Sequence, residues 1–196
     1  MDPRAPLVID TRELGRRAGS QHEVVTTVPA PADLGIEVLG VPEGSPVDLD
    51  LRLEAVMEGV LVTGTAHVEL VGECVRCLEE ITDDASATFQ ELFVHDDGQA
   101  GLEVEDDEES GVRRLEDDLV DLEPVLRDAV VLALPFQPLC SEDCPGLCVE
   151  CGARLADDPE HTHGEAIDPR WAGLTEALGS GRDGAPDTAG PHRHDN

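Results

Sequence analysis

The chain has 196 residues, which is enough for one domain with a substantial hydrophobic core, or for one domain with a small appended module. Its formal net charge of -31 comes from 44 carboxylates against 13 basic residues, all of them arginine, so tight direct binding of nucleic acid through phosphate contacts is disfavoured. No segment approaches the roughly 20 apolar residues that cross a bilayer, and no apolar run after Met1 resembles a signal peptide. We therefore expect a cytoplasmic protein, without membrane contact, whose thiols are reduced.

The negative charge has two readings. A field of this sign attracts cationic partners and speeds their encounter. The alternative is a solvated acidic surface that promotes only solubility.

The first 46 residues are rich in Pro and Gly and contain only short apolar pieces, at residues 7–9, 22–28 and 36–39. This pattern predicts an N-terminal segment, residues 1–46, of short strands separated by loops.

The clearest periodicity begins at Val47. Apolar and charged residues alternate over residues 47–57, repeat the alternation over 60–70 after a turn at Glu58 and Gly59, and resume it over 81–93. A period of two is typical of half-buried strands, so we predict an antiparallel sheet within residues 47–138.

An acidic stretch and a helix follow the predicted sheet. Residues 95–118 are dominated by Asp, Glu and Gly and predict a mobile acidic loop, after which residues 119–121 predict a short edge strand. Residues 123–134 carry a wide apolar face, with Pro124 in the first turn and Pro135 at the end. The fold class expected is therefore α+β, with one helix packed on an antiparallel sheet.

The remainder of the chain predicts a Cys/His segment over residues 139–178, which ends in a short helix that begins near Asp168. The final stretch, 179–196, predicts a disordered tail, and we interpret its His192 and His194 as tail residues rather than ligands.

Eight soft or borderline ligands stand out in this sequence, enough for two tetrahedral sites. Thiolate and imidazole are the ligands that Zn²⁺ prefers, and a two-residue gap lets a tight turn direct both sulfurs at one ion. The competing uses of the cysteines are a disulfide framework, a redox pair, or simple packing, and acidic neighbours disfavour the redox reading. We predict one or two structural zinc ions, with the metal ligands drawn from Cys74, Cys77, Cys140, Cys144, Cys148, Cys151, His161 and His163.

Two pairings of these ligands are open. In one, the contiguous cysteines from Cys140 to Cys151 share an ion, which leaves the first Cys pair for the histidines. In the other, Cys74 and Cys77 meet Cys140 and Cys144, and the second Cys-x-x-Cys meets the two histidines. The second is favoured because Gly152 gives the later pair the form of a zinc-ribbon knuckle, and its ligands close a small loop.

Four sequence segments together resemble one bacterial family. They are VLVTG at 60–64, GECVRCLE at 72–79, LALPFQPLCSEDCPGLCVECG at 132–152 and IDPRWAGL at 167–174. This combination is similar to the YceD family of large ribosomal RNA subunit accumulation proteins, over roughly residues 45–178. Many members of that family have Cys-x-Cys where this chain has His161-Thr162-His163, an exchange that keeps zinc competence.

The resemblance implies a non-enzymatic factor in large ribosomal subunit biogenesis that supports 23S rRNA accumulation. We expect it to bind a basic large-subunit ribosomal protein or a pre-ribosomal particle through acidic segments such as residues 103–109. The alternative is a zinc-dependent RNA-binding module in which Arg76, Arg113, Arg114 and Arg127 touch rRNA. No catalytic or cofactor-binding residues are predicted.

Overall fold

The computed structural model describes residues 2–95 and 113–163. The chain divides into two compact units, Met1–Leu147 and Cys148–Asn196. Within the described residues, all helices and strands belong to the first unit: β1 (Val8–Asp10), β2 (Gln21–Pro29), β3 (Leu34–Ile36), β4 (Leu39–Val41), β5 (Pro46–Ala55), β6 (Gly59–Glu73), β7 (Glu80–Val94), β8 (Arg113–Arg114), β9 (Leu119–Asp121) and α1 (Glu123–Ala133).

The centre of the sheet is the antiparallel set β5, β6 and β7. Val47 of β5 is opposite Val68 of β6, and the pairing runs to Ala55 opposite Val60. Every second residue of β5 is buried, from Val47 to Ala55, while the residues between them face solvent or are half-buried. The three strands predicted from alternating hydrophobicity are confirmed.

β6 and β7 form one long hairpin. Their register runs from Gly59 opposite Val94 to Glu73 opposite Glu80, so residues 74–79 make the connection. Cys74 and Cys77 therefore lie in the turn between two antiparallel strands.

The N-terminal residues add strands to this sheet. β2 pairs along nine residues with β5, and β4 pairs with β6 beyond the end of β5. The apolar piece expected at 36–39 is not itself a strand, because β3 ends at Ile36 and β4 begins at Leu39. The chain turns there, and Glu37 and Val38 are exposed at the turn.

The predicted acidic loop is shorter than expected at its C-terminal end. Arg113 and Arg114 form β8, which runs parallel to the end of β7, and Leu115 is buried. The amide of Leu115 donates a hydrogen bond to the Val94 carbonyl at 2.9 Å, so backbone pairing outweighs the polar composition here. Residues 96–112, including the acidic run 103–109, lie outside the described residues.

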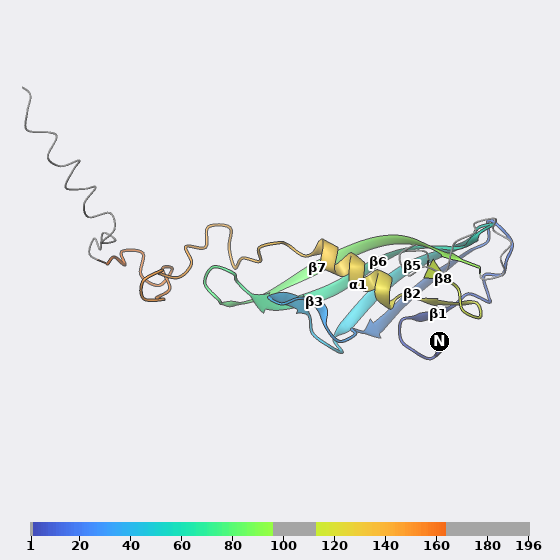
Figure 1. Ribbon diagram of the computed structural model, residues 1–196, viewed down its shortest axis with the longest axis horizontal. Coiled ribbons are helices and arrows are strands. Elements are labelled where there is room, and N and C mark those ends of the chain that lie inside the picture. The colour runs from blue at the N-terminus through green and yellow to red at the C-terminus, as the bar shows by residue number, and fades with distance from the viewer. Residues whose placement is uncertain (1, 96–112, 164–196) are drawn as a thin grey trace, which may run out of the picture. The chain divides into compact units, whose positions relative to one another are not determined.

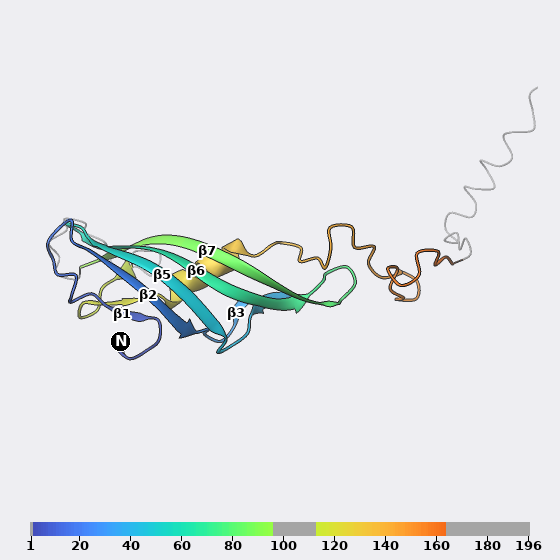
Figure 2. The same ribbon diagram turned by 180° about the vertical axis from the view of Figure 1, so that it is seen from behind.

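The predicted helix is confirmed as α1, which has a proline in its first turn and is capped by Leu134. α1 lies across one face of the sheet (Figure 1), and the view from behind places the sheet in front of the helix (Figure 2). Its buried residues Val125, Leu126 and Val130 join the inward side chains of β5, β6 and β7 in one hydrophobic core. β1 and β9 form an antiparallel pair. Val120 of β9 belongs to that core, and its neighbour Leu119 is also buried.

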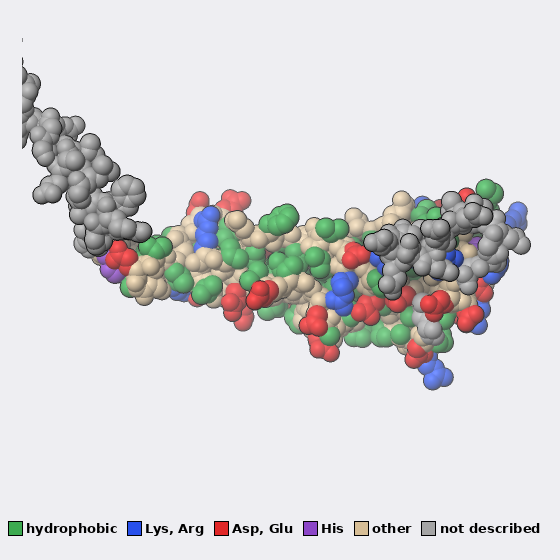
Figure 3. Space-filling view, viewed as in Figure 1, with side chains coloured by type: hydrophobic (Ala, Val, Ile, Leu, Met, Phe, Trp, Pro, Cys, Tyr) green, Lys and Arg blue, Asp and Glu red, His purple; other side chains and the backbone are tan. Residues whose placement is uncertain are grey.

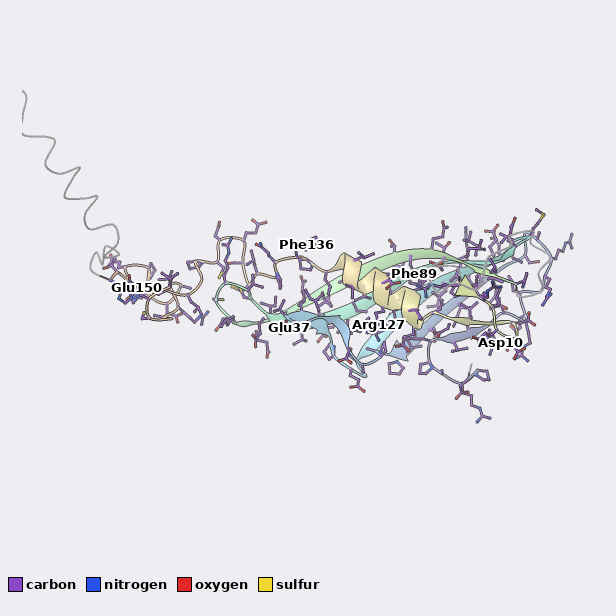
Figure 4. The ribbon with its side chains drawn as sticks, viewed as in Figure 1. Asp10, Glu37, Phe89, Arg127, Phe136 and Glu150 are labelled. Atoms are coloured by element: carbon purple, nitrogen blue, oxygen red, sulfur yellow. The ribbon has the colours of Figure 1, made fainter. Side chains whose placement is uncertain are left out.

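A guanidinium ties the helix to the β3 region. Arg127 donates to the carbonyls of Ala32 and Asp33, and it pairs with Glu123 at 3.0 Å (Figure 4). On the side of the molecule that carries α1, hydrophobic, acidic and arginine side chains are interspersed (Figure 3). Within residues 2–95 and 113–163, no helix is both long enough and apolar enough to span a membrane.

Candidate metal centres

The connection between β6 and β7 folds as a tight knuckle. The Cys74 amide donates to the Glu79 carbonyl at 2.7 Å, and the Leu78 amide donates back to the Cys74 carbonyl at 2.8 Å. Leu78 closes this loop with φ of +60°, a left-handed conformation that non-glycine residues seldom adopt.

A second knuckle, in the unit that begins at Cys148, repeats the same pattern. The Cys148 amide donates to Ala153 at 2.7 Å, and the Gly152 amide donates to Cys148 at 2.8 Å. Gly152 has φ of +74°, at the position that corresponds to Leu78. Both Cys-x-x-Cys segments therefore have the backbone of a metal knuckle, and only the second carries the glycine that signals it in the sequence.

The segment that contains Cys140 and Cys144 is held against the first knuckle by main-chain contacts. Val75 donates to the Pro138 carbonyl at 3.0 Å, and Leu147 donates to the Arg76 carbonyl at 3.1 Å. The Arg76 side chain donates in return to the Cys144 carbonyl at 3.0 Å. Arg76 thus fixes the returning chain from both its backbone and its side chain.

This arrangement brings four sulfurs together. The four-cysteine cluster, Cys74, Cys77, Cys140 and Cys144, has all its Sγ atoms within 4.8 Å of one another. Cys74 Sγ is 3.8 Å from Cys144 Sγ, and Cys77 Sγ is 3.5 Å from Cys140 Sγ. A tetrahedral ion with bonds of about 2.3 Å to sulfur sets neighbouring sulfurs about 3.8 Å apart, so the spacing fits one Zn²⁺.

The mixed cluster consists of Cys148, Cys151, His161 and His163, again within 4.8 Å. Cys151 Sγ is 3.3 Å from His161 Nε2 and 3.2 Å from His163 Nε2, and the two Nε2 atoms are 3.0 Å apart. Tetrahedral bonds to nitrogen of about 2.0–2.1 Å set the ligand atoms about 3.3–3.6 Å apart, so these distances are slightly short but compatible with one ion.

Carboxylates lie behind both imidazoles. His163 Nδ1 is 3.4 Å from a Glu150 oxygen (Figure 4), and His161 Nδ1 is 3.9 Å from an Asp158 oxygen. Metal-ligating histidines commonly donate the second ring N–H to a carboxylate, which fixes the ring and raises its basicity. The Nε2 atoms of the two rings lie 3.0 Å apart, and each is near Cys151 Sγ. Neither Glu150 nor Asp158 was predicted, because their spacing carries no motif of its own.

Hydrogen bonds change the acidity of one thiol in the mixed cluster and of several in the four-cysteine cluster. Burial raises the pKa of Cys74, but hydrogen bonds from the backbone amides of Cys140, Arg76 and Cys77 outweigh it and lower the pKa from 9.0 to about 6. The amides of Cys151 and Glu150 likewise lower the pKa of Cys148 to about 6. In contrast, hydrogen bonds with Cys144 and Cys77 raise the pKa of Cys140 to about 12. Each knuckle thus favours the thiolate, the form that binds metal, at its first cysteine.

The clusters match the favoured pairing of the predicted ligands. All eight fall into two sets of four that could hold a metal ion, and the six cysteines are free thiols. The contiguous pairing is wrong, because Cys140 and Cys144 turn back to the β6–β7 knuckle. His192 and His194 lie outside the described residues.

The arginines considered for RNA contact are engaged within the protein. Arg113 pairs with Asp128 at 3.0 Å and with Glu91 at 3.9 Å. Arg76 and Arg127 bond to backbone carbonyls, and Arg114 has a partner as well.

Sequence comparisons identify the family of this chain. A family model described as large ribosomal RNA subunit accumulation protein YceD matches residues 62–176, a range that holds both clusters. The chain belongs to the YceD family. This confirms the resemblance inferred from the four sequence segments.

Members of the YceD family similar to this chain include proteins without a described activity. An uncharacterised protein of Mycobacterium tuberculosis is 47% identical over 175 residues, which covers 89% of this chain and 83% of the relative. One from Mycobacterium leprae is 42% identical over 89% of this chain and 78% of the relative. YlbN of Bacillus subtilis is 28% identical over 68% of this chain and 75% of that protein. No solved structure matches the chain.

Proposed function

We propose that this YceD family protein is a non-enzymatic factor in large ribosomal subunit biogenesis that supports accumulation of 23S rRNA. Membership of a family named for large ribosomal RNA subunit accumulation is the observation that carries the proposal. Ribosome assembly places such a factor in the cytoplasm.

The proposed role of the metal is structural. Each cluster offers four ligands, which fills a tetrahedral zinc ion and leaves no open position for a substrate. In the four-cysteine cluster, a bound ion would link the β6–β7 knuckle to the chain 63 or more residues later, so metal binding and folding of this region are coupled.

The proposed direct partner is a basic large-subunit ribosomal protein rather than rRNA. The net charge of -31 repels phosphate and attracts a cationic protein. The engagement of Arg113 and Arg127 in internal contacts also gives direct RNA binding no support. The effect on rRNA would then follow from delivery or protection of that protein.

Depletion of the protein in its own bacterium tests the proposal. We expect the ratio of mature large-subunit rRNA to small-subunit rRNA to fall, together with the free large-subunit peak in sedimentation profiles. An unchanged ratio would rule out the assembly role. Binding of a purified rRNA fragment in a filter assay, with no binding of basic ribosomal proteins, would instead favour the RNA-binding alternative.

A further inference from the structure

The sheet of the first unit has two unlike faces. Its inner face is the core that α1 covers, and its outer face is the opposite one, which lies nearest the viewer in Figure 2. Directly opposed residues in the paired strands share a face, so the registers give rows across β2, β5, β6 and β7. One row is Val25, Asp50, Thr65 and Thr88, and the described residues place no helix or strand over it.

The outer face is strongly acidic. Its cationic groups are Arg52 and, when protonated, His67, and its other polar side chains are mainly Thr, Ser and Gln. Its carboxylates are Glu23, Asp48, Asp50, Glu54, Glu69, Glu73, Glu80 and Asp84.

Most of these carboxylates have no cationic partner. Arg52 lies 3.5 Å from Glu54, and Asp48 accepts a hydrogen bond from Thr27 at 2.6 Å. The side chains of Glu23, Asp50, Glu69 and Asp84 make no ion pair or side-chain hydrogen bond within the described part of the chain. The face therefore has the capacity to bind several cations at once.

The strand register also places two carboxylates of this face against each other. Glu69 lies directly opposite Asp84 across β6 and β7. Like charges in directly opposed positions destabilise a sheet, so this pair lowers the stability of the free protein. A cation bound between the two carboxylates would replace this repulsion by attraction and stabilise the sheet.

The spacing of the face suits an extended chain. Asp48 and Asp50 follow one another on the same side of β5, about 6.8 Å apart. Alternate side chains of an extended peptide have the same repeat, so successive basic residues on one side of it meet successive carboxylates. Val25, which is 80% exposed midway along the edge strand β2, offers an apolar contact for the stems of Lys or Arg.

We propose that the outer face of β2, β5, β6 and β7 is the docking surface for an extended Lys- or Arg-rich segment of a protein partner. The identity of that partner as a ribosomal protein rests on the proposed function, whereas the surface rests on the register and charge of the sheet. The two are tested separately.

The test compares two triple variants of the full-length protein that lose equal charge. The face variant is Glu23→Gln, Asp50→Asn and Glu69→Gln. The control variant changes Glu13, Glu37 and Glu43 to Gln, three exposed carboxylates in loops outside the face that likewise lack a partner in the described chain. The probe is a short polyarginine peptide, measured by calorimetry at physiological ionic strength, with an rRNA fragment as a second probe.

We expect the face variant to bind the peptide about tenfold more weakly than the wild type, and the control variant to lose about twofold or less. Amide chemical shifts of the wild-type protein should change along β2, β5, β6 and β7 when the peptide is added, a result that needs no variant to fold. If both variants lost peptide affinity equally, or if the chemical shifts changed only in other segments, the proposed docking surface would be wrong. Binding of the rRNA fragment to this face in preference to the peptide would overturn it as well. If the surface fails while depletion still lowers large-subunit rRNA, the proposed function stands without it.

Discussion

In each knuckle, one residue with positive φ helps the backbone amides to point at a cysteine sulfur. Apart from the Cys140 amide, the amides that lower the pKa of Cys74 and Cys148 are oriented by backbone turns, and each turn ends in a residue with positive φ. In one turn that residue is Gly152, and in the other it is Leu78.

Replacing either thiol of the first knuckle should release metal. Cys74→Ser or Cys77→Ser removes a buried ligand from the four-cysteine cluster, so we expect metal content to fall by about one ion per chain and the melting temperature to drop clearly. Elemental analysis and thermal melts measure both effects. His22→Ala, on exposed β2, is the control and should change neither. Melting curves that coincide for all three variants would refute the structural role of this cluster.

Substitutions at Leu78 test whether the knuckle needs a residue in the left-handed conformation. Glycine adopts φ near +60° without the Cβ clash that costs other residues roughly 1–2 kcal/mol. Leu78→Gly should therefore be more stable than Leu78→Ala by about 1 kcal/mol, since alanine keeps the strain and loses the side chain. Chemical denaturation with metal bound gives the difference. If alanine proved as stable as glycine, the knuckle would not need a left-handed residue there.

At the scale of elements, the decisive contact is that between the first knuckle and the segment from Pro138 to Leu147. Gly146 has φ of +80°, and a Cβ at this position would lie 3.1 Å from the Arg76 carbonyl oxygen. The glycine permits the close approach that brings Cys144 to the knuckle.

Gly146→Ala should therefore loosen this segment. We expect a loss of roughly 1 kcal/mol from backbone strain and a further loss from the contact with Arg76, together with weaker metal retention by the four-cysteine cluster. Gly44→Ala is a matched control, because Gly44 has φ of +76° but nothing within 4 Å of the added Cβ. Competition with a chromogenic chelator measures retention. Equal retention in the two variants would contradict the docking role of Gly146.

At the scale of the whole molecule, the two clusters differ in how open they are to solvent. Cys74, Cys77 and Cys144 are buried, whereas the mixed cluster has its ligands exposed or half-buried, with Cys151 and His163 exposed. The sheet and α1 form a separate apolar core that contains neither cluster.

Chelation should therefore remove metal in two stages. We expect the mixed cluster to lose its ion first, because its ligands are accessible, while the four-cysteine cluster releases its ion more slowly. Metal content over time should pass through about one ion per chain, with the β-sheet circular dichroism signal unchanged in the first stage. Single-step loss of both ions together with the sheet signal would contradict independent clusters.

Local pattern alone determined the three central strands and the helix. Alternating hydrophobicity in residues 47–57, 60–70 and 81–93 predicted β5, β6 and β7, and the apolar face of residues 123–134 predicted α1, because each periodicity is set by neighbours in the sequence. The ligand types and the glycine of the second knuckle were also readable in this way.

Only the tertiary structure decided which cysteines share a cluster. Cys77 and Cys140 are 63 residues apart, and their meeting depends on α1, on the Arg76 contacts and on the close approach at Gly146, which no local pattern encodes. The local sequence likewise does not predict the left-handed conformation of Leu78, the strand at Arg113 or the position of Glu69 opposite Asp84. The physical reason is that register and long-range docking depend on how distant segments fit, whereas periodicity depends only on the chain itself.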